Sequence, residues 1–170
     1  MARPYGLLRA GFPYYRTLGM RRITNFPIDV AFGKDNTVYV LLRSEGASVI
    51  RVWSLDDAEQ LTGDLVAIGG YGTDDGQFQW PVQLVTNAEG DLFVSDEATH
   101  RITQFHPDGE FVAKWGTEGT GVGELNGPAG IAFDNEGNLV VVDSLICRMA
   151  WESYMSISSH SRSKGSSTFA

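Results

Sequence analysis

Short runs of apolar and β-branched residues, separated by turn residues, extend along most of the chain between residues 26 and 148. The runs are near-continuous in hydrophobicity, which is typical of strands that are covered on both faces. Between residues 80 and 116 they predict four strands, at 82–86, 91–95, 102–105 and 110–115. No segment keeps the helical period of about 3.6 residues over three turns, so the pattern predicts an all-β fold with almost no helix.

Two tight turns connect these predicted strands. The first is "NAEG" at 87–90, and an Asn at the first position with a Gly at the fourth is typical of a type I turn. The second is "HPDG" at 106–109, where Pro107 stands at the second turn position and has the φ that this position requires. Each turn therefore joins two antiparallel strands.

The stretch 80–101 recurs further along the chain. Aligned with 127–148 at a constant offset of 47 residues, it matches Pro81 with Pro128, Gly90 with Gly137, Asp96 with Asp143 and Arg101 with Arg148. A more divergent copy begins at Pro27, 54 residues before Pro81, and has Asn36 in place of the turn glycine. Because Asn is the usual substitute where φ is positive, we expect a left-handed residue there. The glycine-rich spacers at 69–78 and 115–125 repeat as well.

Units of about 40–50 residues with four strands each are the blades of β-propellers, which place about four to eight blades around a channel. The series formed by the strand-initiating proline, "LFVSD", "HRI", "PDG" and "WG" resembles the NHL repeat, a family of propeller blades. The resemblance covers about residues 14–148, and the first copy lacks the acid and the His-Arg pair. It implies a partial β-propeller of four-stranded antiparallel blades.

The repeat divides the chain into five predicted segments. An N-terminal segment at 1–22 includes the closing strand of an incomplete blade, and it is followed by blade one at 23–78, blade two at 79–125, part of blade three at 126–150 and a disordered or aberrant tail at 151–170. Three origins stay open: a truncated or frame-shifted product, a ring completed by copies of the chain, and an open fragment. Because an open end exposes a sheet edge and a blade face, we expect self-association or poor solubility.

Charge is distributed unevenly along the chain. Residues 1–22 carry five arginines and no acid, whereas residues 23–150 carry six basic and twenty acidic residues, a local balance of −14. Such a surface repels phosphate backbones, which argues against nucleic acid and favours cations or basic partners. The sequence contains no secretion signal and no apolar run of the ~18 residues that a membrane helix needs, so a cytoplasmic location is the default expectation.

Ser95, Asp96 and His100 together suggest a nucleophile, an orienting acid and a base, but the repeat argues for structural roles. The spacing from Asp96 to Arg101 recurs in the next copy, and neither a third group nor an oxyanion site is visible. We therefore predict no catalytic residue. The four recurring positions are expected to form charged pairs at strand ends: Asp96, Arg101, Asp143 and Arg148.

Cofactor signals are weak in this sequence. His100 and His106 lie at opposite ends of one predicted strand, so they cannot bind one zinc ion. Asp29, Asp74 and Asp75 offer oxygen ligands for calcium, with a solvated acidic face as the alternative.

Ligand binding is expected on the propeller face that carries the spacers and the loops between second and third strands, here called the loop face. The candidates on this face and at the channel mouth are Asp29, Tyr71, Asp74, Asp75, Trp80, Gln83, His100 and Glu118. The resulting hypothesis is a non-catalytic scaffold that binds a protein, a peptide or a small molecule. The alternative, which the resemblance brings with it, is a fragment of a metal-dependent lyase or hydrolase, such as a peptidyl-hydroxyglycine lyase or a lactonase, inactive without further blades.

Overall fold

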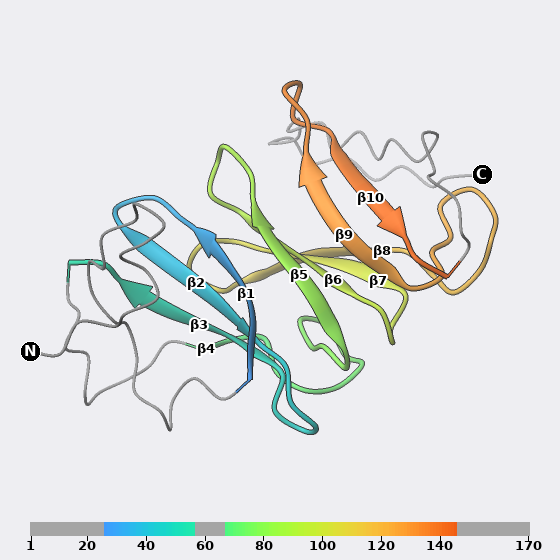
Figure 1. Ribbon diagram of the computed structural model, residues 1–170, viewed down its shortest axis with the longest axis horizontal. Helices are drawn as coiled ribbons and strands as arrows, with labels where there is room; N and C mark the ends of the chain where they lie inside the picture. The colour runs from blue at the N-terminus through green and yellow to red at the C-terminus, as the bar shows by residue number, and fades with distance from the viewer. Residues whose placement is uncertain (1–25, 57–66, 146–170) are drawn as a thin grey trace, which may run out of the picture.

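The computed structural model describes residues 26–56 and 67–145, and all regular secondary structure in these ranges is β-strand. The strands form three antiparallel sheets that lie in a row (Figure 1), here called blades one, two and three. Blade one comprises β1 (Pro27–Phe32), β2 (Thr37–Leu42), β3 (Val49–Ser54) and β4 (Ala67–Ile68); blade two comprises β5 (Pro81–Thr86), β6 (Leu92–Asp96), β7 (Arg101–Phe105) and β8 (Phe111–Trp115); blade three comprises β9 (Pro128–Phe133) and β10 (Leu139–Asp143). The predicted all-β fold is confirmed.

Strand pairing follows the repeat that the sequence shows. We call the first strand of each blade, β1, β5 or β9, its inner strand. Strands β5 and β9 begin at the aligned prolines Pro81 and Pro128, and each blade has a register shift beside its proline. Beyond the shift, equivalent residues are cross-strand neighbours in the three blades: Ala31 with Tyr39, Val85 with Phe93, and Ala132 with Val140. A residue in one blade therefore has a defined equivalent in the next, 54 residues on from blade one to blade two and 47 residues on from blade two to blade three.

The turns between the strands have the predicted backbone. In blade two the N–H of Gly90 donates to the carbonyl of Asn87, whose side-chain oxygen also accepts the N–H groups of Gly90 and Asp91. In blade one, Asn36 has a φ of +57°, as its substitution for glycine predicts. The second turn closes with the N–H of Gly109 donating to the carbonyl of His106.

Glycine is required where each blade passes into its spacer. Gly69 and Gly116 are equivalent positions with φ values of +78° and +99°. A Cβ at Gly69 would lie 2.3 Å from the ring of Phe78, and a Cβ at Gly116 would lie 2.6 Å from the carbonyl oxygen of His100. Both the dihedral angle and the close approach exclude a side chain, so the spacer folds tightly against the blade.

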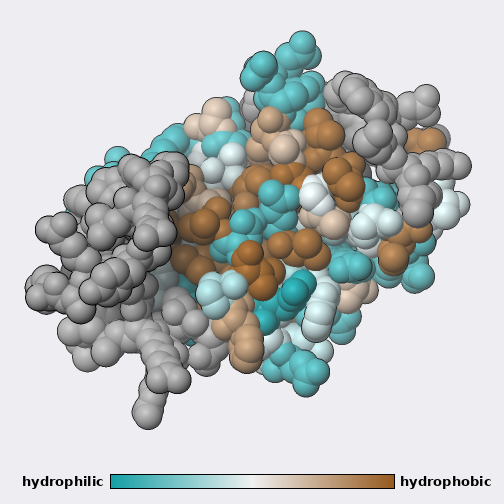
Figure 2. Space-filling model, in the orientation of Figure 1, coloured by the Kyte–Doolittle hydropathy of each residue, from teal (hydrophilic) through white to brown (hydrophobic). Residues whose placement is uncertain are grey.

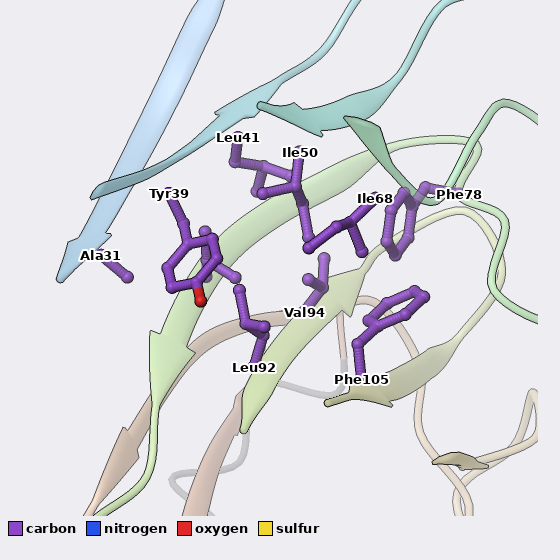
Figure 3. Packing of buried hydrophobic residues seen from close by; sticks show 10 residues of the cluster. Ala31, Tyr39, Leu41, Ile50, Ile68, Phe78, Leu92, Val94 and Phe105 are labelled. Carbon is purple, nitrogen blue, oxygen red and sulfur yellow. The ribbon is translucent and has the colours of Figure 1, made fainter. Parts of the chain in front are cut away.

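Two hydrophobic clusters fill the space between the blades (Figure 3 shows the first). The first packs residues of blade one such as Leu41 and Ile50 against Leu84 and Val94 of blade two. The second packs the opposite face of blade two, including Phe93, against blade three. Strand β6 is buried at every residue, as the near-continuous apolar runs predict. Burying each large side chain contributes roughly 1.5–3 kcal/mol, so stacking of the blades stabilises the fold.

Hydrophobic residues also reach the surface. In the orientation of Figure 1 they gather over the middle of the molecule, bordered by hydrophilic side chains (Figure 2). In the part of the chain that the structure describes, no helix is long and apolar enough to span a membrane.

Candidate functional site on the loop face

The loop face is formed where β1, β5 and β9 begin and where β2, β6 and β10 end. The spacers 69–80 and 116–127 cross it, and their backbones repeat. In the first spacer the N–H of Phe78 donates to the carbonyl of Gly70, and in the second the N–H of Leu125 donates to the carbonyl of Thr117. The tight turns lie at the opposite ends of the strands, on what we call the turn face.

Asp96 holds the end of the first spacer against blade two. Its Oδ2 accepts the N–H of Gln79 at 2.6 Å, and its Oδ1 accepts the N–H of Trp80 at 3.1 Å. The N–H groups of Ala98 and Thr99 also donate to Oδ1, at 3.0 and 3.1 Å. Asp143 repeats the first contact and accepts the N–H of Asn126 at 2.6 Å. The carboxylate is thus a backbone cap that fixes the spacer.

Arg101 binds the same spacer from β7. Its Nη1 donates to the carbonyl of Thr73 at 2.8 Å, and its Nη2 donates to those of Asp74 and Gln77 at 2.9 Å. The predicted charged pair is therefore wrong in one respect: Asp96 and Arg101 are cross-strand neighbours, but both charges bind backbone of the spacer instead of each other. The reason is that a glycine-rich spacer leaves many backbone groups without partners of their own. Arg148 lies outside the described residues.

His100 is a loop residue with a φ of +52°, and its Nδ1 accepts the N–H of Gly127 at 3.2 Å. It therefore connects the loop of blade two to the start of blade three. Ser95 is fully buried; its hydroxyl donates to the carbonyl of Ala129 at 2.7 Å and accepts the N–H of Gln83. Both side chains therefore bind backbone groups, and those of Ala129 and Gly127 belong to blade three and its spacer.

Asp29 and Gln83 join successive inner strands. The N–H of Leu84 donates to Oδ2 of Asp29 at 2.8 Å, and the N–H of Ile131 donates to Oε1 of Gln83 at 2.6 Å. Each acceptor therefore binds the N–H one residue beyond its own equivalent in the next blade. The third residue of this series is Gly130, which has no side chain. We call these contacts the inner ladder, and they occupy one oxygen of each residue that was predicted to line the channel mouth.

Exposed aromatic side chains mark the loop-face ends of β1 and β5. Phe26 and Trp80 are equivalent positions, and their side chains are 71% and 44% exposed. The guanidinium of Arg43 lies over the Trp80 ring, 4.6 Å from its centre, a cation–π contact between blades one and two. We call Phe26, Arg43 and Trp80 the aromatic rim.

The other predicted candidates are spread over the spacers. Tyr71 is 48% exposed; Asp74 and Glu118 are exposed as well. Asp75 forms a 2.6 Å ion pair with Lys114. Within residues 26–56 and 67–145, no group of three or more His, Cys, Asp and Glu side chains is arranged to hold a metal ion, so the three calcium candidates do not come together in such a group.

His106 and Asp134, whose pKa values are shifted, lie on the turn face. Asp91 accepts Nε2 of Gln104 at 2.8 Å and lies 3.0 Å from Nδ1 of His106. The hydrogen bond with Asp91 raises the pKa of His106 above its ordinary value. Hydrogen bonds from Asn138 lower the pKa of Asp134. These groups belong to the turns that connect the strands, at the end of the blades opposite the aromatic rim.

Comparison with known proteins identifies relatives of part of this fold. No protein-family model matches the chain. The chain is similar to the RING finger protein nhl-1 of Caenorhabditis elegans, 36% identical over 64 residues, and to the protein brain tumor of Drosophila melanogaster, 33% identical over 76 residues. These segments cover 38% and 44% of this chain but only 7% of either relative.

Solved structures show the same architecture. A catalytically inactive virginiamycin B lyase from Staphylococcus aureus with quinupristin matches with a TM-score of 0.52 and 13% identity, over 74% of this chain and 37% of that one. A luciferin-regenerating enzyme matches with a TM-score of 0.52 and 13% identity, over 71% and 38%. At this identity the likeness concerns the fold alone. The three sheets of this chain are blades of an NHL-type β-propeller.

Two members of the aromatic rim in these NHL-type blades, Phe26 and Arg43, were not predicted as site residues from the sequence. Phe26 precedes Pro27 as Trp80 precedes Pro81, so an aromatic residue before the proline in both copies was a readable signal. Arg43 gave no such signal, because its partner Trp80 lies in the next blade. The candidate site of this NHL-type propeller is therefore the aromatic rim, with the exposed acids of the same face around it.

Proposed function

We propose that this NHL-type propeller is a non-catalytic scaffold that binds a basic segment of a protein partner on its loop face. The observation that carries the proposal is the aromatic rim. Two large aromatic side chains stay 71% and 44% exposed at equivalent positions of adjacent blades, whereas aromatic residues between the blades such as Phe78, Phe93 and Phe105 are buried. Exposed aromatic side chains that a rigid scaffold holds in place are typical anchors of protein interfaces.

The rim is well prepared for binding. Trp80 is fixed at its backbone by Asp96, and its ring is already covered on one face by Arg43. A partner that covers the remaining surface therefore orders few additional torsions, which lowers the entropic cost of association. Trp and Arg are also the residue types that contribute most often to interface hot spots.

Charge supports a basic partner. Residues 23–150 have a balance of −14, and Asp74 and Glu118 are exposed on the loop face. Two of the basic side chains there are engaged, since Arg101 binds spacer carbonyls and Lys114 pairs with Asp75. A Lys- or Arg-rich segment would meet complementary potential, whereas a phosphate backbone would be repelled.

The enzymatic alternative receives less support from this chain. A metal-dependent lyase or lactonase of this architecture would need ligands from several inner strands, and the equivalent positions here are Asp29, Gln83 and Gly130. The first two use acceptor oxygens in the inner ladder. The activities of virginiamycin B lyase and of the luciferin-regenerating enzyme belong to those proteins, because the likeness shows a common fold only.

An array of short synthetic peptides of equal length tests the proposal. Half of the peptides are rich in Lys and Arg, and half are rich in Asp and Glu. We expect binding to be confined to the basic half. For the tightest binder, Trp80→Ala is expected to raise the Kd by roughly 30-fold, measured by fluorescence anisotropy, because a buried Trp anchor contributes about 2 kcal/mol.

Val112→Ala is the matched control, since Val112 is 39% exposed on β8 outside the aromatic rim. Trp80→Ala keeps the backbone N–H that binds Asp96, so the variant retains this contact of the fold. Equal loss of affinity in both variants, binding of the acidic peptides, or tighter binding of single-stranded RNA than of any peptide would each contradict the proposal.

A further inference from the structure

The outer face of blade one exposes residues whose equivalents are buried elsewhere. We call the side of a blade that faces the preceding blade its back face. Val30 is 51% exposed, whereas its equivalents on the back faces of blades two and three, Leu84 and Ile131, are 2% and 3% exposed. Phe32 on the same face is 65% exposed. The back face of blade one thus has the composition of an internal blade surface; it is exposed along β1, whereas Val38 and Trp53 on the same face are buried.

The front face of blade three, which is the side that would face a following blade, likewise exposes residues whose equivalents are buried. Val140 is 40% exposed, whereas its equivalents Tyr39 and Phe93 are 3% and 1% exposed. Val142 is 52% exposed, whereas its equivalents Leu41 and Ser95 are fully buried. The two faces with these exposed residues lie on the blades at opposite ends of the row in Figure 1.

We propose that a second copy of the chain covers these faces, with the front face of blade three in one copy packed on the back face of blade one in the other. Inside the chain, the same kind of contact is made twice, in the clusters between blades one and two and between blades two and three. Leu41 and Leu84, the equivalents of Val142 and Val30, belong to one of these clusters. The proposed interface is therefore a third instance of an existing packing arrangement.

The inner ladder fits this junction. Within the chain, Asp29 and Gln83 supply an acceptor for the inner-strand N–H of the next blade. At the proposed junction the supplying position is Gly130, which has no acceptor to offer. The receiving N–H is that of Val30, and it already donates to Oδ1 of its neighbour Asp29 at 2.9 Å. The inner-strand N–H of Val30 therefore needs no acceptor from the second copy.

The contact is heterologous, since it joins two different surfaces, and such contacts close into rings or extend into filaments. Each copy contributes three sheets in its described part, so two copies provide six. Closed propellers contain about four to eight blades. A ring of two copies is therefore the assembly that we expect.

Two single substitutions and their mixture test the proposal. The full chain is expected to sediment with twice the mass of one 18.6-kDa chain and to dissociate on dilution. Val142→Lys and Val30→Glu, studied separately, are each expected to weaken the dimer at least about a hundredfold, because an unpaired charge would be buried at both junctions. Both side chains are about half exposed in the single chain, so neither change removes a buried contact within it.

Mixing the two variants is the decisive arm. In a mixed ring one junction joins Lys to Glu and the other junction has both wild-type residues, so dimers are expected to return. Val122→Lys, a change at a fully exposed spacer residue, is the control and leaves the dimer unchanged. A monomeric wild-type chain at all concentrations would overturn the proposal and point to a blade of another protein as the occupant. An oligomer that tolerates both single variants, or a mixture that stays monomeric, would overturn it as well.

Discussion

Blades one and two have the same strand order, the same register shift and the same turns, yet they treat the loop face differently. Blade two ends β6 with Asp96 and begins β7 with Arg101, and these two residues bind the preceding spacer. Blade one has the apolar residues Leu42 and Val49 at the equivalent positions. A four-stranded blade therefore forms without the charged residues, whose task is to fix the glycine-rich spacer that leads into blade two.

The comparison explains why the acid and the arginine of this stretch bind backbone groups. A spacer rich in glycine provides few side chains for packing but many N–H and C=O groups that need partners. Asp96 and Arg101 make five of these bonds to the spacer, two accepted by Asp96 and three donated by Arg101. Asp96 also accepts two N–H groups of the loop that follows β6. In blade one, Arg43 stands one residue beyond Leu42 and binds the ring of Trp80 instead.

Asp96→Leu converts the blade-two position into the blade-one residue and is expected to have the largest effect. Four backbone N–H groups lose their acceptor at a fully buried position, so the free energy of unfolding should fall by about 3–5 kcal/mol. Urea unfolding measures the change, and limited proteolysis in the spacer 69–80 should accelerate in parallel.

Asp96→Asn distinguishes the contributions of the two carboxylate oxygens to stability. The amide retains one acceptor for the three N–H groups at Oδ1 and loses the one for Gln79, so about half of the destabilisation is expected. If Asp96→Leu were as stable as the wild type, blade two would not need its carboxylate, and the difference between the two blades would have no structural meaning.

The sequence predicted most of what is local in this fold. The turn at 87–90, the positive φ of Asn36 and the start of β5 and β9 at aligned prolines all follow from residues within a few positions of each other. The stacking of three sheets follows from the spacing of the repeat. These features depend on backbone preferences and on burial periodicity, which a single sequence records directly.

The partners of the polar residues could not be predicted in the same way. Asp29 binds the N–H of Leu84, 55 residues away, and Arg43 lies over the ring of Trp80, 37 residues away. A backbone N–H has no identity in the sequence, so nothing in the residue pattern shows which group a carboxylate will cap. The sequence places Asp96 and Arg101 side by side, and only the coordinates show that both bind the spacer.

Gln83→Ala tests the inner ladder, where the two blades also differ. Asp29 offers two oxygens and binds Val30 as well as Leu84, while Gln83 binds the N–H of Ile131 through Oε1. Removing the Gln83 side chain leaves one partly buried N–H without its acceptor, and the free energy of unfolding should fall by about 1 kcal/mol.

Gln83→Glu is the matched variant for the hydrogen bond from the N–H of Ile131. It retains an acceptor in the same place and should recover most of the stability. Thermal unfolding of the two variants side by side measures the difference. Equal destabilisation by Ala and by Glu would show that the N–H of Ile131 does not depend on this side chain, and the junction argument for Gly130 would lose its support.

The smallest expected effect is a pH-dependent contribution to stability that blade two has and blade one lacks. Blade two has the Asp91–His106 contact on its turn face, whereas blade one has Thr37 and Ser54 at the equivalent positions, which do not titrate. The hydrogen bond with Asp91 raises the folded-state pKa of His106 above about 6.5. The contact therefore contributes stability that is complete below the unfolded-state pKa and is lost as the pH rises through the folded-state pKa.

Since the His106 side chain is 49% exposed, solvent screening limits this contribution to a few tenths of a kcal/mol, within the range of surface ion pairs. The free energy of unfolding of the wild type should exceed that of His106→Gln by this amount at about pH 5, and the difference should vanish at about pH 9. A difference that grows with rising pH would show that the neutral ring is the form that binds Asp91. In that case blade two would have no acid-stabilised contact to distinguish it from blade one.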